Sequence, residues 1–284
     1  MKEPSDFGSI FSGWVAKERS VSGLALIGSR ERAQTDAIWR ADADSDWDFH
    51  LITSKPNLFL DALWTKRLAG TDLRVYVARM TRIGSVPKVN AVFAGTEVDI
   101  VVIPTPIIRR HRFLTRIGWH RRKGPVRQFL QDLAVVVRPG FRFLKDTGNW
   151  DAFYRFAVNA VTDARVSNDA AKVIADGFVC DYVWTVRKIA RGEYFAAQRM
   201  LHRELMEANF RLLHELKLRR GERTFPEARR IERVAQPEEL ARLSTATSLE
   251  AATLSGALEK SAQACRELMR GLVGEGWAWP RLDR

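Results

Sequence analysis

Hydrophobic and polar positions alternate along the first half of the chain and recur at helical spacing along the second half. Short apolar runs that end in turn residues predict strands at 23–27, 46–53, 73–79, 88–95 and 96–104, and a further short strand and turn at 140–150. Helical spacing is found between these runs, at 9–21 and 57–70. Interspersed strands and helices of this kind indicate a compact α/β (α+β) domain with a mixed sheet.

Strand patterns nearly vanish after this region. Apolar residues recur with a period of about 3.6 in the segments 150–166, 170–190, 193–218 and 248–272. Polar or glycine-containing breaks separate these segments, as expected of a C-terminal helical bundle. We therefore expect two domains, with residues 1–146 forming the α/β domain and residues 147–284 the helical domain.

Composition places the chain among ordinary globular proteins. It has 284 residues, of which 46% are hydrophobic and 28% charged. No segment approaches the run of about 18 apolar residues that a membrane-spanning helix needs. The two cysteines, Cys180 and Cys265, lie far apart and are typical of small buried residues in a reducing compartment. These features predict a cytoplasmic protein without membrane contact, and they do not address its oligomeric state.

The net charge of +12 is concentrated in one stretch. Residues 1–106 hold 13 basic and 13 acidic residues, whereas residues 107–145 hold 11 basic residues and a single acid, Asp132. Two interpretations stay open for this basic segment. It is either a solvated helical face or a site for an anion, such as a triphosphate, pyrophosphate or RNA.

Acidic residues open two of the predicted strands. Asp46 and Asp48 stand two residues apart at the start of one strand, so their side chains point to the same face. Two carboxylates that close repel each other unless a cation lies between them. Asp99 opens a later strand in the same way, and three carboxylates on neighbouring strands can hold a pair of Mg²⁺ ions.

Other residues compete for these roles. Asp42 and Asp44 are in phase with the pair, but the apolar strand follows Asp46 and Asp48, which we therefore favour. Glu97 shares the strand face of Asp99 and is the alternative third carboxylate. His50 falls on the aspartate face, where we expect an orienting or packing role.

The motif "LALIGSRERAQTD…SDWDFHLIT" resembles the signature of the polymerase-beta-type nucleotidyltransferases. That signature is a strand, a Gly-Ser turn, a helix, an Asp-x-Asp pair and an acid on a later strand. Within the superfamily, the chain is most similar to the aminoglycoside nucleotidyltransferases, especially the streptomycin 6-adenylyltransferase type. There, "GTEVDIVVIP" resembles the strand of the third carboxylate, and "YVWTVRKIARGEYFAAQRMLHREL" resembles a C-terminal helix pair.

The resemblance implies transfer of a nucleoside monophosphate, with AMP from ATP as the first expectation, to a hydroxyl group with release of pyrophosphate. Asp46 and Asp48 would bind two Mg²⁺ ions, and Asp99 would complete one metal site and could accept the proton of the attacking hydroxyl. The base could equally be another carboxylate, and the candidates are Glu97, Glu193 and Glu204.

The resemblance also implies how ATP or another NTP is held. Gly28 and Ser29 would cradle the triphosphate, with backbone N–H groups and a hydroxyl facing the phosphate oxygens. Arg187, Lys188 and Arg191, on the helical domain, would stabilise the charge that develops on pyrophosphate.

Three kinds of acceptor or activity remain open. The first is a small hydroxyl-bearing molecule, including an aminoglycoside-like antibiotic, for which the enzyme would be a resistance factor. A polycationic acceptor needs acids, and Glu193, Glu204 and Glu207 could supply them unless they form a solvated helix face. The second is RNA or a protein, with the basic segment 107–145 as the contact. The third is a non-catalytic protein that binds NTP and regulates.

Overall fold

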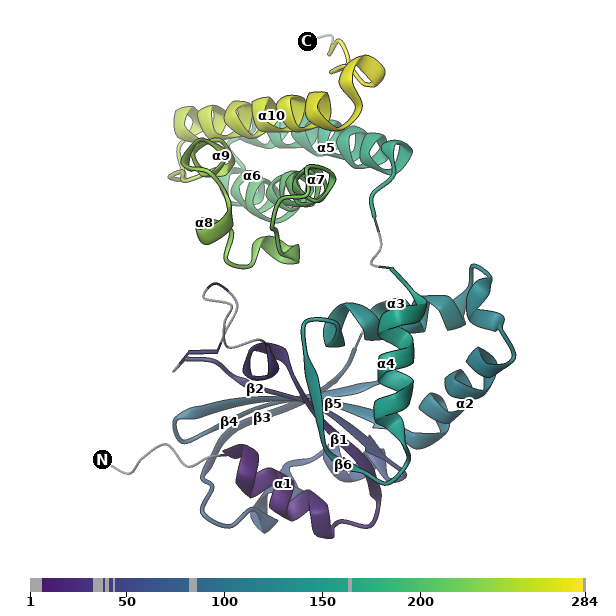
Figure 1. Cartoon of the computed structure of the whole chain (residues 1–284). Helices are drawn as coiled ribbons and strands as arrows, with labels where there is room; N and C mark the ends of the chain where they lie inside the picture. Colours follow the sequence, from purple (N-terminus) through teal and green to yellow (C-terminus); the bar gives the residue numbers. More distant parts are fainter. Residues whose placement is uncertain are drawn as a thin grey trace. The chain divides into compact units, whose positions relative to one another are not determined.

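The computed structural model describes residues 7–32, 38, 41–42, 44–81, 86–162 and 165–282. The chain divides into two compact units, Met1–Ala164 and Arg165–Arg284 (Figure 1). Each unit has its own hydrophobic core, and each is considered by itself below.

The first unit is built on a six-stranded mixed sheet with the order β3-β4-β5-β2-β1-β6. The central pair, β2 and β5, is parallel, and every other neighbouring pair is antiparallel. This confirms the predicted mixed sheet. The strands are β1 (Val21–Ile27), β2 (Trp47–Thr53), β3 (Leu73–Met80), β4 (Pro87–Phe93), β5 (Thr96–Pro104) and β6 (Phe141–Asp146).

Helices cover both faces of this sheet (Figure 1). One face packs against α1 (Phe7–Lys17) through strand residues such as Phe49 and Ile100. The other face packs against α2 (Thr105–Arg116), α3 (Pro125–Val137) and α4 (Trp150–Ala160) through residues such as Ile52 and Ile103. Because side chains alternate across a strand, Asp48 and Asp99 share the face of Ile52 and Ile103.

One segment of the first unit differs from expectation. Residues 57–70 were expected to form one helix but contain two short 3₁₀ helices, η2 (Pro56–Phe59) and η3 (Ala62–Arg67). The capping side chain of Asp61, which accepts a hydrogen bond from the Leu63 amide at 2.7 Å, starts the second 3₁₀ helix and so divides the segment. The basic segment 107–145 forms most of α2, a 3₁₀ turn η4 (Trp119–Arg121), α3 and most of β6.

The boundary between the compact units falls at 164/165, whereas the sequence places the domain boundary at 146/147. The difference is α4, which belongs to the first unit. Its buried residues Trp150, Phe153, Tyr154 and Ala157 join the core that includes Ile27 and Ile52 of the sheet. Helical spacing alone shows which face of a helix is buried and does not show what that face packs against.

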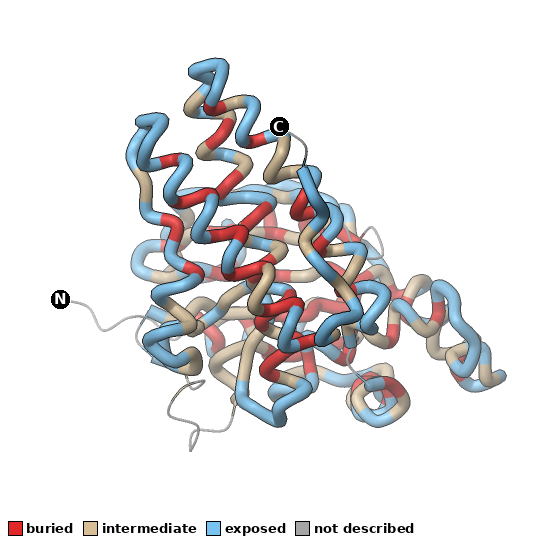
Figure 2. The backbone as a smooth tube through the Cα atoms, turned by 90° about the horizontal axis from the view of Figure 1, so that it is seen from above, coloured by how far each residue is buried: buried red, intermediate tan, exposed pale blue. Residues whose placement is uncertain are grey.

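The second unit is a helical bundle, as predicted, and buried and exposed residues alternate along its helices (Figure 2). The segment 193–218 forms a nearly continuous helix that contains a single π-helical turn, Leu201–Leu205. The helices are α5 (Asn168–Ala190), α6 (Tyr194–Met200), α7 (Met206–Arg219), α8 (Ile231–Val234), α9 (Pro237–Leu243) and α10 (Ala251–Val273), with short 3₁₀ turns η6 (Pro226–Ala228) and η7 (Gly274–Gly276).

Glu215 of α7 is a buried anion that ties the start of this unit to its core. Its carboxylate accepts hydrogen bonds from Arg165 at 2.8 Å, from Arg219 at 3.0 Å and from the Val166 amide at 3.0 Å. Burial raises the pKa of Glu215, but these donors outweigh burial and lower it to about 2. The carboxylate is therefore charged at neutral pH.

The cysteines differ from expectation in one respect. Cys265 is buried, and burial raises the pKa of its thiol to about 12, whereas Cys180 is exposed on α5.

Among the described helices, none combines the length and the apolar character needed to cross a membrane.

Candidate active site

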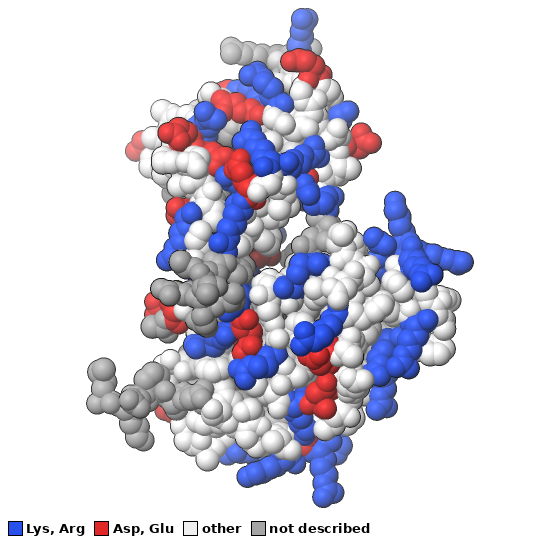
Figure 3. Space-filling model, viewed as in Figure 1, with Lys and Arg blue, Asp and Glu red and all other residues white. Residues whose placement is uncertain are grey.

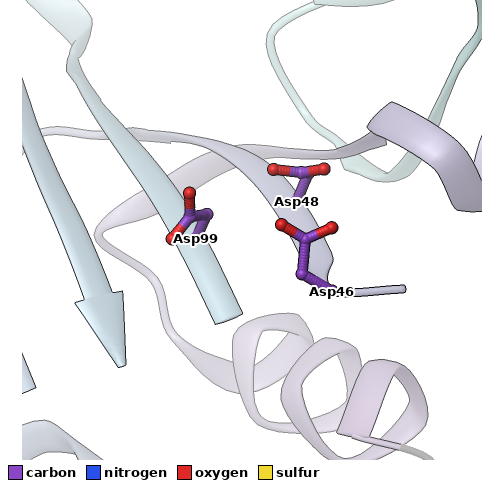
Figure 4. Close-up of side chains that lie close together, drawn as sticks. All are labelled: Asp46, Asp48 and Asp99. Atoms are coloured by element: carbon purple, nitrogen blue, oxygen red, sulfur yellow. The ribbon is translucent and has the colours of Figure 1, made fainter. Parts of the chain in front are cut away.

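Three carboxylates converge at one end of the two parallel strands. Asp48 of β2 and Asp99 of β5 are direct partners in the strand register, and Asp46 immediately precedes β2. Ligand oxygens of the three side chains all lie within 4.8 Å of one another, and all three residues are half-buried. The side chains face a common space (Figure 4). The structure therefore brings together the three acids that the sequence singled out.

Strand β4 supplies two donors to Asp99. Lys88 Nζ lies 2.5 Å from Asp99 Oδ2, and the Asn90 amide donates to Asp99 Oδ1. Asn90 and Asp99 are direct register partners, so their side chains share one face of the sheet. The sequence analysis missed both donors. The signal was present in "PKVNAVF", where polar residues at alternate positions mark a polar strand face.

Gly28 lies against Asp48 at the end of β1. Its φ of +76° is a conformation that favours glycine, and a Cβ added there would lie 2.1 Å from Asp48 Oδ2. Ser29 follows, with its Oγ buried and without a hydrogen-bond partner in the described part of the chain. A buried hydroxyl without a partner is costly, and a ligand oxygen would satisfy it. The Gly-Ser turn thus lies beside the carboxylates and offers an unused polar group.

Arg30 holds the chain that leads into β2. Its guanidinium donates to the backbone oxygens of Asp46, at 2.9 Å, and of Ser45. It also stacks on the indole of Trp47, with 4.2 Å from its central carbon to the ring centroid. These contacts fix the backbone of Asp46 from the neighbouring turn Gly28–Glu31. Sequence reasoning gave Arg30 no role, because the contact joins residues sixteen positions apart.

His50 follows Asp48 by two residues on β2, so its side chain lies on the same strand face and next to Asp48 along the strand. It is buried and shares a hydrogen bond of 3.0 Å between Nδ1 and the Tyr154 hydroxyl of α4. Burial, with a smaller contribution from Lys88, lowers the pKa of His50 to about 4. Burial also raises the pKa of Tyr154. Both groups are neutral at pH 7, and His50 links the site to α4.

The competing acids of the first unit lie outside the cluster. Asp44 is exposed, and Asp42 accepts a hydrogen bond from Ser45 Oγ at 2.8 Å in its own loop. Glu97 is exposed near the start of β5. Among the described residues, Asp46, Asp48 and Asp99 form the one group of acids, histidines and cysteines close enough to share a metal ion.

The predicted phosphate-binding cations belong to the second unit. Lys188 pairs with Glu193 at 2.5 Å and lies over the Trp184 ring, while Arg187 and Arg191 are exposed. Their part in nucleotide binding stays a prediction. Glu204 pairs with Arg203 at 3.2 Å, as expected of a solvated helix face.

The donor set fits a hard divalent cation. Carboxylate oxygens are the ligands that Mg²⁺ prefers, and Mg²⁺ keeps several of its waters, which suits half-buried ligands. Without a cation between them, three carboxylates this close would repel one another, and the ammonium of Lys88 lies on the Asp99 side of the cluster. A metal ion held by Asp46 and Asp48, with Asp99 as a further ligand, would remove this repulsion.

Comparisons with known proteins give weak structural similarity. No family model matches the chain, and no curated protein sequence matches it. Among solved structures, the chain is similar to an aminoglycoside 6-adenyltransferase from Bacillus subtilis, at 12% identity and a TM-score of 0.39, over 99% of this chain and 94% of that one. It is also similar to a nucleotidyltransferase-like protein from Exiguobacterium sibiricum, at 11% identity and a TM-score of 0.36, over 93% of this chain and 74% of that one.

Proposed function

We propose that the protein is a metal-dependent nucleotidyltransferase that moves a nucleoside monophosphate from an NTP, in the first instance ATP, to a hydroxyl group. The observation that supports this most strongly is the convergence of Asp46, Asp48 and Asp99 within 4.8 Å, next to the Gly28-Ser29 turn. In the reaction, the acceptor oxygen forms a bond to the α-phosphorus, and the bond from that phosphorus to the bridging oxygen of the β-phosphate breaks. Pyrophosphate leaves, and the hydroxyl proton passes to a base.

The residues of the site have separate tasks in this proposal. Asp46 and Asp48 hold Mg²⁺, and Asp99 completes the ligand set. Bound Mg²⁺ would neutralise phosphate charge and lower the pKa of an attacking hydroxyl. The Ser29 hydroxyl donates to a phosphate oxygen, and Gly28 leaves room for the Asp48 carboxylate beside the turn.

Asp99 is well placed as a ligand and less well placed as a base. Both of its oxygens already accept from β4, one from Lys88 and one from Asn90. An oxygen that already accepts from a neighbouring side chain is poorly oriented to receive the proton of an acceptor hydroxyl. We therefore assign Asp99 to metal binding, and leave proton acceptance to a second carboxylate or to water.

The acceptor in this proposal is a small molecule with a free hydroxyl group, and aminoglycosides are the first class to test because of the motif resemblance. The protein is incubated with Mg²⁺, each NTP and a panel of acceptors that includes streptomycin, and pyrophosphate release is measured. We expect acceptor-dependent release that is abolished by EDTA and lowered at least 1,000-fold in Asp46→Asn/Asp48→Asn.

The matched control is Asp44→Asn, which removes an exposed carboxylate two residues from Asp46 and outside the cluster. We expect it to release pyrophosphate like the wild type. Binding of Mn²⁺, followed by electron paramagnetic resonance, provides a readout that needs no acceptor. Equal Mn²⁺ binding by the wild type and the double variant would refute the metal site, and with it the proposed function.

A further inference from the structure

The basic segment forms an exposed surface at the far end of β5 from Asp99. Helix α2 begins at Thr105, directly after β5 ends at Pro104, and η4 and α3 complete a helical hairpin. We call residues 105–137 the basic hairpin. Figure 3 shows Lys and Arg side chains gathered over α2 and the turn after it, on the right-hand side of the view. Six residues of extended strand span roughly 20 Å, so this surface is separate from the carboxylates.

The inner side of the basic hairpin is fixed by packing. Ile108 and Leu130 belong to the core against the sheet, and the His111 ring stacks on Phe129 with 3.9 Å between centroids. The Arg112 guanidinium donates to the Gly148 backbone oxygen at 2.8 Å. The outer side is therefore held in a defined orientation.

Most cations of the segment lack an ion pair or hydrogen bond within the described part of the chain. Four of the 11 in residues 107–145 have protein partners, namely Arg112, Arg138, Arg142 and Lys145. The other seven make no ion pair or hydrogen bond to any described residue: Arg109, Arg110, Arg116, Arg121, Arg122, Lys123 and Arg127. Positive charges that lie close together repel one another, which lowers stability unless an anionic partner offsets the repulsion.

Large apolar side chains lie among these cations and are exposed to solvent. Phe113 is 61% exposed, Ile117 53% and Trp119 56%. On α2 and its C-cap residue Ile117, the exposed positions 109, 110, 113, 116 and 117 recur at helical spacing, so arginines and apolar residues share one face. A helix that inserts into a membrane surface instead separates its apolar face from its basic face. The mixed face argues against a lipid partner.

The types of residue match a single-stranded polynucleotide. Six of the seven unpaired cations are arginines, whose planar guanidinium group binds phosphate with two hydrogen bonds and stacks on bases. Exposed rings such as Phe113 and Trp119 stack on bases that are not enclosed in a duplex. A double helix would engage the cations through its phosphates and leave the rings without partners.

From this charge complementarity and the interleaved rings, we propose that the basic hairpin binds single-stranded RNA. Phosphates would contact the arginines of α2 and of the turn at residues 119–123, and bases would stack on Trp119 and Phe113. The proposal goes beyond the proposed function, since it needs neither catalysis nor the carboxylates.

The test is fluorescence anisotropy of the full chain with a labelled, unstructured 12-nucleotide RNA across a salt series. The first variant is Arg109→Gln/Arg110→Gln/Arg116→Gln. The matched control, Lys66→Gln/Arg79→Gln/Lys260→Gln, removes the same net charge from three exposed cations elsewhere that have no partner among the described residues. We expect the first variant to bind at least 30-fold more weakly at 50 mM salt, and the salt slope to fall by about 2, since each phosphate contact on a single strand contributes about 0.7.

Trp119→Ala tests stacking and leaves the charge unchanged. We expect about tenfold weaker binding of single strands and little change for a duplex of the same length, because base stacking is worth about 1–3 kcal/mol. The proposal is overturned if the wild type does not bind the RNA, or if the control variant loses as much affinity as the hairpin variant. It is also overturned if the duplex binds as tightly as the single strand, or if vesicles of anionic lipid bind the hairpin and RNA does not.

Discussion

Replacing Gly28 by alanine tests whether the Gly-Ser turn shapes the carboxylate cluster. Two separate penalties are expected. The first is conformational, since a φ of +76° costs an L-residue about 1–2 kcal/mol. The second is steric, since the new Cβ would lie 2.1 Å from Asp48 Oδ2 and 3.0 Å from Asp48 Cβ. The Asp48 side chain would have to leave its rotamer, which costs about 1 kcal/mol more and moves a carboxylate out of the cluster.

The two penalties are separated by the choice of assay. Together they amount to about 2–3 kcal/mol, which lowers the unfolding temperature of a unit this size by about 4–12 °C. Displacement of Asp48 should also weaken Mn²⁺ binding at least tenfold, which corresponds to about 1.4 kcal/mol. Thermal unfolding and electron paramagnetic resonance of bound Mn²⁺ measure the two effects on the same protein.

Gly70→Ala and Gly95→Ala are the matched controls. Both glycines have a φ of +79°, and an added Cβ would meet nothing within 4 Å at either position. We expect these variants to lose about 1–2 kcal/mol of stability and to bind Mn²⁺ like the wild type. If Gly28→Ala binds Mn²⁺ as tightly as the controls, the close approach of Gly28 to Asp48 has no part in forming the site.

Three further predictions concern charged groups around the two cores. Lys88→Met removes the ammonium that competes with a metal ion for Asp99, so Mn²⁺ affinity should rise several-fold in a titration. Lower affinity would show that Lys88 instead holds the Asp99 side chain in place for the metal. The pKa of His50 is about 4 in the folded protein and 6.5 in the unfolded chain. The stability that comes from keeping its imidazole neutral is therefore complete above pH 6.5. As the pH falls from 6.5 toward 4, the free energy of unfolding should drop by about 3 kcal/mol. Denaturant unfolding of His50→Asn should show a correspondingly smaller loss between pH 7 and 4, and an unchanged pH dependence would contradict the buried neutral state. Glu215→Gln should destabilise the second unit by about 3 kcal/mol at pH 7, since Arg165 and Arg219 lose their anion. The difference in stability from the wild type should shrink as the pH falls from 4.5 toward 2, because the wild-type carboxylate then takes up a proton. A difference independent of pH would indicate a packing effect.

The sequence by itself determined the strands of the first unit and the acidic residues that open two of them. Alternation in "DWDFHLIT" and "TEVDIVVIP" identified two strands, and it placed Asp46 with Asp48, and Asp99 with Glu97, on common faces. The period of two is a local property of an extended chain, so it can be seen without knowledge of the fold. The long helices of the second unit were predicted in the same way, from the period of 3.6.

Only the tertiary structure decided which strands are neighbours and what the functional side chains touch. The parallel pairing of β2 with β5 sets Asp48 opposite Asp99, and the antiparallel pairing of β4 brings Lys88 and Asn90 to the same carboxylate. Similarly, the core around Trp150 assigned α4 to the first unit. Periodicity records which face of an element is buried, whereas pairing and packing join residues that are distant in sequence, and local patterns carry no information about those partners.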